Sequence, residues 1–304
     1  MESDMSTTPP SIDALGQADS AEEFAESVRT HGFALLRQAI DGDTVERVRQ
    51  ICDQHLHTHD QDAENEIEAS KLLAEPTLAG VIFNSTVTAA LTHALGGTLT
   101  YYPNYVVRLN RFTTWHVDNG FLPQYHGEPD HLYDPDFRHL QAVVYLQDNE
   151  PGAGGGLDVV AGSHNWARDG VVPEIGSAAT GPDHSPLFDR YGTGSAVDSR
   201  AGDLLVFDGR LLHRGSPSDG SATLRKYGIF FSASRSDPLQ VSRYAAYLGG
   251  RGAYMRSQNA DPERYEYMLR RYDDVLGVTY PSSYRPETVR FIDENRIGIA
   301  DLRQ

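Results

Sequence analysis

Residues 201–217 read AGDLLVFDGRLLHRGSP. A Gly-Asp turn signal opens this stretch, and the apolar residues after it predict a buried strand over 203–207. The chain then reaches His213, which is followed by small residues. A histidine at a strand end beside glycine is better placed to bind a ligand than to fill a core. The stretch therefore predicts a β-fold that carries a functional histidine.

Four more segments have the composition of strands, with β-branched and aromatic residues between clusters of Gly, Pro and Asp. They cover residues 98–109, 140–146, 156–160 and 223–232. Several short strands with turn signals and few helices among them indicate a sandwich or a barrel.

Helices are expected mainly before and after these strands. Ser20 and Glu23 form a capping-box pattern ahead of a helix over 21–30, and 33–36 reads as a short strand. The other predicted helices cover residues 44–57, 67–73, 87–95 and 262–275, the last followed by a Pro/Tyr-rich tail. Residues 1–18 are polar and are predicted to be a disordered tail, which leaves 19–304 as one domain.

The charge balance narrows the possible partners. The chain has 43 acidic and 26 basic residues and a formal net charge of −17, which disfavours nucleic acid and anionic membrane surfaces. Its one cysteine, Cys52, excludes an internal disulfide and a multi-cysteine metal cluster. With a polar start and no apolar stretch of about 18 residues, we expect a cytoplasmic protein.

His116 and Asp118 are the next candidates for chemistry. Residues i and i+2 of an extended chain project to one side, so this imidazole and this carboxylate converge. They form the start of a two-histidine, one-carboxylate site for non-haem Fe(II). With 12 histidines in the chain, one such pair is expected by chance, and a surface hydrogen-bonded pair is the alternative.

Arg225 follows His213 by twelve residues, past a turn. A facial triad leaves three iron positions open, and a dicarboxylate chelator can fill two of them. Its far carboxylate would then meet a guanidinium in a bidentate, charge-assisted contact. Lys226 is a rival, but strand alternation sends the two side chains to opposite faces, and arginine has the fork geometry.

Taken together, these segments resemble the phytanoyl-CoA dioxygenase family of Fe(II)- and 2-oxoglutarate-dependent oxygenases. The likeness covers about residues 20–235 and rests on the segments THGFALL (30–36), WHVD (115–118), VYLQD (144–148), GGLDVVAGSH (155–164), 202–213 and Arg225. The resemblance implies a mainly β fold with flanking helices, namely a double-stranded β-helix, which is a jelly-roll, cupin-like barrel.

The resemblance also implies roles for single residues. His116, Asp118 and His213 would be the catalytic iron ligands, and Arg225 would hold the C5 carboxylate of 2-oxoglutarate. Thr113 stands where some relatives hydrogen-bond this cosubstrate. The implied cofactors are Fe(II), 2-oxoglutarate and O2. One departure from the family pattern is a turn before Arg225 that is about a residue longer than usual.

Asp118 disfavours halogenation, because halogenating relatives have a small residue there so that chloride can reach the metal. Hydroxylation is therefore expected, with desaturation and epoxidation as alternatives. A non-catalytic barrel that binds metal and 2-oxo acid is the rival from another class. The prime substrate is expected to be a small neutral or cationic secondary metabolite, since no Lys/Arg cluster suits the phosphates of an acyl-CoA.

Segments that flank the ligands are expected to form the substrate walls. The candidates are Asn119, Phe121, Tyr125, Trp166 and Tyr254, and the glycines before Tyr254 would permit movement. The alternative is that these aromatic side chains only pack the loops onto the barrel.

Overall fold

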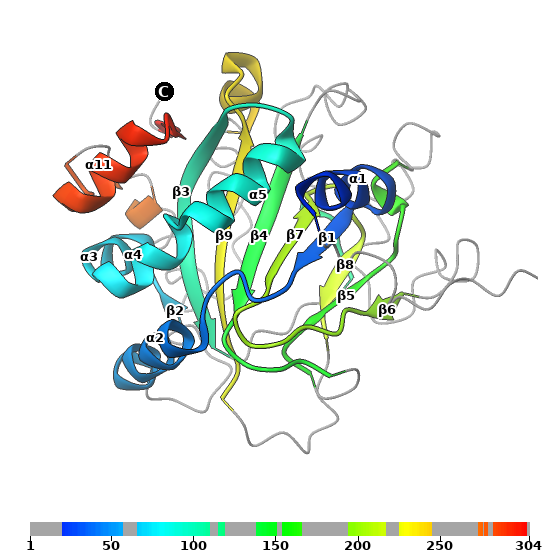
Figure 1. Ribbon diagram of the computed structural model, residues 1–304, viewed down its shortest axis with the longest axis horizontal. Coiled ribbons are helices and arrows are strands. Elements are labelled where there is room, and N and C mark those ends of the chain that lie inside the picture. Colours follow the sequence, from blue (N-terminus) through cyan, green and yellow to red (C-terminus); the bar gives the residue numbers. More distant parts are fainter. Residues whose placement is uncertain are drawn as a thin grey trace, which may run out of the picture.

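The computed structural model describes residues 20–56, 66–109, 115–118, 138–150, 154–165, 194–216, 225–244, 273–275, 277–278 and 282–302. Its centre is a large, mostly antiparallel sheet that lies beside a smaller sheet (Figure 1). Helix α5 crosses the large sheet, while α1 lies over the β1 end (Figure 1).

The large sheet has the strand order β1-β7-β4-β9-β3-β10, and β2 also pairs with β3. Every described pairing in it is antiparallel except the parallel pair of β10 and β3. The strands are β1 (Phe33–Leu36), β2 (Glu66–Ile67), β3 (Leu99–Leu109), β4 (His139–Tyr145), β7 (Leu204–Asp208), β9 (Tyr227–Arg235) and β10 (Gly298–Ile299).

The smaller sheet has the order β6-β5-β8, with β5 at Leu157–Val159, β6 at Ser195–Ala196 and β8 at His213–Gly215. His116 extends this sheet, because its backbone N–H donates to the His213 carbonyl oxygen at 2.9 Å and its carbonyl oxygen accepts from the His213 N–H at 3.0 Å. This arrangement is that of the predicted double-stranded β-helix. The large sheet contains the order β3-β9-β4-β7, and beside it the smaller sheet runs from the segment 115–118 through β8 and β5 to β6. Between the described strands the two sheets share no pairing, so they form an open jelly roll.

Six helices are described in full, and the N-terminal ones pack on one face of the large sheet. The Ser20 hydroxyl accepts a bond from the Glu23 backbone N–H at 3.1 Å, which is the predicted N-cap. The helices are α1 (Ala21–His31), α2 (Gly42–His55), α3 (Ala69–Ala74), α4 (Pro76–Ile82), α5 (Ser85–Leu95) and α11 (Pro286–Glu294).

Alternation along the central strands divides the core into two clusters. Val144, Ile229 and Phe231 belong to the outer cluster, which the large sheet forms with the helices. Val143 and Tyr145 belong to the inner cluster, which fills the space toward β5 and β7, and Phe230 packs against it. Odd-numbered residues of β9 therefore face the helices, and even-numbered ones face the interior of the jelly roll.

Several predicted boundaries are corrected. Residues 66–67 form a strand and not the start of a helix, and the expected tail contains α11 and β10. The predicted tail 1–18 and most of the predicted helix 262–275 lie outside the described residues. That 19–304 form one domain stays a prediction.

One segment, Pro76–Leu95, has the length and composition of a membrane span, contrary to the expectation from sequence. It is broken into α4 and α5, and the Asn84 carboxamide oxygen accepts the bond from Thr86 that caps α5. Most of the segment is buried inside the protein. It is therefore a pair of core helices by its packing.

The turn before β7 depends on a glycine. Gly202 has φ 88°, and a Cβ there would lie 2.3 Å from the Ile40 carbonyl oxygen. We expect Gly202→Ala to lower the free energy of unfolding by at least about 2 kcal/mol, because it adds left-handed strain to a steric clash. Gly80→Ala is the control, since Gly80 is helical with open space around it, and it should raise stability by up to about 1 kcal/mol. Urea unfolding measures both, and equal effects would contradict the prediction.

Candidate metal centre

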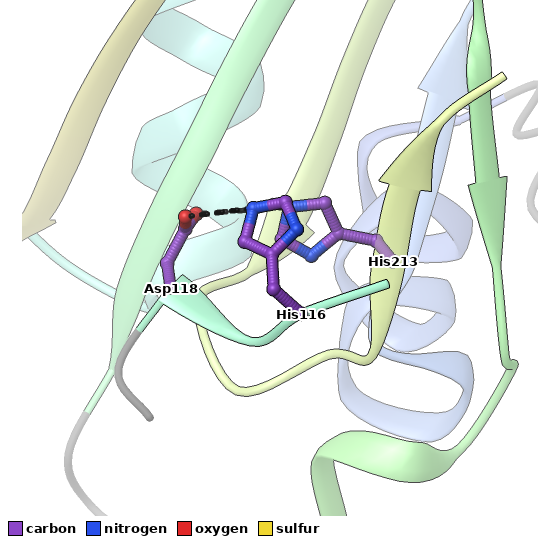
Figure 2. A group of neighbouring side chains, drawn as sticks. All are labelled: His116, Asp118 and His213. Carbon is purple, nitrogen blue, oxygen red and sulfur yellow. Dashed lines mark ion pairs between the residues drawn. The ribbon is translucent and has the colours of Figure 1, made fainter. Parts of the chain in front are cut away.

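Three predicted ligands converge at one end of the smaller sheet (Figure 2). His116 Nε2 lies 3.7 Å from Asp118 Oδ1, and His213 Nε2 lies 4.0 Å from Asp118 Oδ2. The two imidazole rings lie 4.3 Å apart between centroids. The backbone pair between His116 and His213 fixes this spacing, because it places both histidines at neighbouring positions of two strands.

The geometry and the donor types fit a divalent transition metal. The three ligand atoms all lie within 4.8 Å of one another. An ion with bonds of about 2 Å can bridge each histidine–carboxylate spacing. His213 Nδ1 lies 2.8 Å from the Leu211 carbonyl oxygen, so it carries the proton and leaves Nε2 to bind metal. Two imidazoles and one carboxylate are the donors of non-haem Fe(II) sites.

The site is open on one side. The His213 side chain is 5% exposed, whereas those of His116 and Asp118 are 22% and 18% exposed. The Phe207 ring lies 4.6 Å from the His213 ring and packs its inner side. His116 and Asp118 therefore form the more exposed side of the cluster.

Sequence reasoning missed His139, the first residue of β4. It is buried, its ring stacks on Tyr244 at 3.8 Å, and Tyr102 lies edge-on at 5.7 Å. In the described structure neither ring nitrogen has a hydrogen-bond partner. Burial lowers the pKa of His139 to about 4, although the charges of Asp118 and Asp208 oppose this shift. The available signal in the sequence was a histidine that opens an apolar strand.

The shifted pKa of His139 makes a pH-dependent contribution to stability. The pKa is 6.5 in the unfolded chain and about 4 in the fold, so the unfolded state binds the proton first. We expect metal-free protein to lose up to about 3 kcal/mol of unfolding free energy from this group as the pH falls from 6.5 to 4. His139→Phe should flatten this slope in urea titrations, while the smaller contribution of His164, whose pKa burial also lowers, remains. An unchanged slope would contradict the prediction.

Arg225 does not point toward the three ligands. Its Nη1 lies 3.4 Å from Asp53 Oδ1 of α2, and its guanidinium lies 5.6 Å from the centre of the Tyr227 ring, which belongs to the outer cluster. Arg225 therefore lies on the helix side of the large sheet, and its expected role toward 2-oxoglutarate stays a prediction. Lys226, the rival, is buried on the other face.

The remaining site predictions cannot be placed. Thr113, Asn119, Phe121, Tyr125, Trp166 and Tyr254 all lie outside the described residues. His164 is described, and its Nε2 lies 3.0 Å from the Arg29 carbonyl oxygen, so it ties its turn to α1.

An open jelly roll with a His-Asp-His cluster at one end of its smaller sheet defines the class of cupin-like metal-dependent oxygenases. Within this class, residues 28–226 match the model of the family described as phytanoyl-CoA dioxygenase (PhyH). The match covers more than half of the chain, and the chain belongs to this family. It is thus an enzyme of the Fe(II)- and 2-oxoglutarate-dependent oxygenase superfamily, with O2 as the other cosubstrate.

Solved structures share the fold at low identity. The epimerase SnoN, solved with Fe3+, alpha ketoglutarate and nogalamycin RO, is 17% identical, with a TM-score of 0.54 over 71% of this chain and 84% of its own. EctD from S. alaskensis in its apoform is 17% identical, with a TM-score of 0.53 over 76% and 83%. HygX from Streptomyces hygroscopicus, with nickel and 2-oxoglutarate bound, is 18% identical, with a TM-score of 0.52 over 69% and 85%. The comparison with curated proteins finds no significant match.

Proposed function

We propose that this enzyme hydroxylates a small molecule and holds its Fe(II) through His116, Asp118 and His213. The convergence of these three side chains at 3.7 and 4.0 Å carries the proposal. They come from two segments nearly a hundred residues apart and meet on the accessible side of the jelly roll.

When bound, the iron and its cosubstrates supply the oxidising power. One molecule each of 2-oxoglutarate and O2 are consumed, succinate and CO2 leave, and one oxygen atom enters the substrate. The chain's own residues set the conditions for this reaction. The Leu211 carbonyl holds the His213 ring in the metal-binding tautomer, and Asp118 occupies the position that a halide would need. Phe207 keeps water from the inner side of His213.

The substrate we propose is a small neutral or cationic secondary metabolite. The net charge of −17 disfavours polyphosphate-bearing compounds such as acyl-CoA thioesters. Nogalamycin RO in the SnoN structure is a small molecule bound by a protein of this fold. The same charge and the single cysteine support a cytoplasmic enzyme without nucleic-acid or membrane partners.

Anaerobic titration of Fe(II) and 2-oxoglutarate tests the proposal, with a weak visible charge-transfer band as the signal. We expect the band, and slow succinate formation once O2 is admitted. Compounds that increase succinate formation would then be oxidised in the presence of labelled O2. Label in their product would indicate hydroxylation or epoxidation, and its absence would indicate desaturation or epimerisation. A folded protein that binds both ligands but forms no succinate would support the non-catalytic barrel instead.

A further inference from the structure

The structure shows to which face of the large sheet the Lys226 side chain points, which the sequence alone did not decide. The role inferred for this lysine rests on the proposed function. An iron-chelated 2-oxoglutarate has a far carboxylate that needs a cation inside the jelly roll. Arg225 faces α2 and Asp53 on the outside of the large sheet. Lys226 follows it directly and has the parity of Phe230, which packs on the inner cluster. The Lys226 side chain therefore points into the interior of the jelly roll.

The contacts of Lys226 confirm this direction. The residue is 6% exposed, and its Nζ donates to the Gly154 carbonyl oxygen. A Cβ at Gly155 would lie 2.2 Å from Lys226 Cδ. The lysine stem thus fills the space that a side chain at 155 would occupy, and it reaches from the large sheet to the turn that leads into β5. This accounts for the glycine at 155, which makes room for the lysine.

The distance from the metal ligands suits a five-carbon dicarboxylate. Gly155 donates to the Ser216 carbonyl oxygen, and Ser216 lies three residues after His213 on the same strand and its extension. At about 3.3 Å per residue, the lysine contacts lie roughly 10 Å along the sheet from His213. That is roughly the span of a dicarboxylate that chelates a metal at one end and meets an ammonium group at the other.

The surroundings favour an ion pair with a bound carboxylate. Val143, Tyr145 and Leu157 belong to the inner cluster and Phe230 packs on it, and a charge pair among such apolar side chains is screened less than in water. Arg108 also approaches this space, with its guanidinium 5.1 Å from the Phe230 ring centre, but Glu66 accepts a 3.0 Å bond from its Nε. Burial lowers the pKa of Lys226, and the charge of Glu150 opposes this shift, as a carboxylate bound beside the lysine would too.

We propose that Lys226, and not Arg225, binds the C5 carboxylate of 2-oxoglutarate in this enzyme. Gly155 leaves the space for its stem, and the ammonium group closes the end of the site opposite the metal.

The test compares two 2-oxo acids of five carbons, 2-oxoglutarate and 2-oxovalerate, which lacks the far carboxylate. Dissociation constants come from anaerobic titrations of the Fe(II) protein, followed by the charge-transfer band. We expect Lys226→Met to weaken 2-oxoglutarate by about 10- to 100-fold, which is the value of a hydrogen bond to a charged group, and to leave 2-oxovalerate unchanged. The matched control Arg225→Met should change neither by more than about twofold. Lys226→Arg should restore most of the affinity for 2-oxoglutarate, because the charge is kept.

The possible outcomes are distinct. Loss of 2-oxoglutarate affinity in Arg225→Met, with Lys226→Met unaffected, would overturn the proposal and restore the assignment from sequence. Equal weakening of both acids in Lys226→Met would overturn it too, since the lysine would then be only structural. A wild-type protein that binds Fe(II) and gives no band with either acid would contradict the proposed function itself.

Discussion

Replacing His213 by alanine should lower the Fe(II) affinity by more than about 100-fold and abolish 2-oxoglutarate turnover. Even the outer partners of metal ligands are worth about 10- to 100-fold in affinity, and His213 is proposed to be a ligand itself. Its side chain is the most buried of the three and is positioned by Leu211 and Phe207. His116→Ala should have the same effect, because its Nε2 lies 3.7 Å from Asp118 Oδ1 in the same cluster.

The measurement is Fe(II) binding under anaerobic conditions, with succinate formation as the second readout. His93→Ala is the control, because His93 lies exposed near the end of α5 and bonds only its own helix. Thermal melts of the metal-free variants should match wild type within a few degrees. Full activity in either ligand variant would show that the metal centre is elsewhere.

Asp118→Gly should remove at least about 99% of substrate oxidation while leaving the fold intact. The carboxylate is the one anionic donor of the cluster, and its loss opens a coordination position. Added chloride should then enter the metal shell and shift the charge-transfer band of the variant but not that of wild type. We do not expect useful halogenation, because the outcome of a radical also depends on where the substrate lies.

One result would contradict the prediction for Asp118→Gly. If Asp118→Gly binds Fe(II) like wild type and oxidises substrate at the wild-type rate, Asp118 is not a ligand. Asp118→Glu provides a comparison, since it keeps the charge and changes only the reach of the carboxylate.

The sequence was most informative where its pattern is strong. The apolar run that became β7 and the alternation that became β3 predicted their strands closely, because buried strands need such residues. The spacing of His116 and Asp118 predicted half of the metal centre, and the histidine after β7 predicted the rest. Long-range pairing brought the two halves together, and no local signal encodes it.

The sequence was least informative where short elements or strand register decide the structure. β8 and β10 have three and two residues, too few for a period to be visible. The choice between Arg225 and Lys226 depends on the parity of β9, and a shift of one residue exchanges the two faces. The orphan nitrogens of His139 depend on Tyr102 and Tyr244, which come from distant segments.

Both edges of the large sheet are covered by pieces from far along the chain. β1 borders β7 at one edge, while β2 and β10 pair with opposite ends of β3 at the other. β10 (residues 298–299) comes long after β3 in the chain, so residues 100–101 of β3 lack this partner until that later segment has been synthesised. An exposed edge strand is a template for pairing with other molecules. Until β10 arrives, this end of β3 is therefore an edge at which another chain could add a strand.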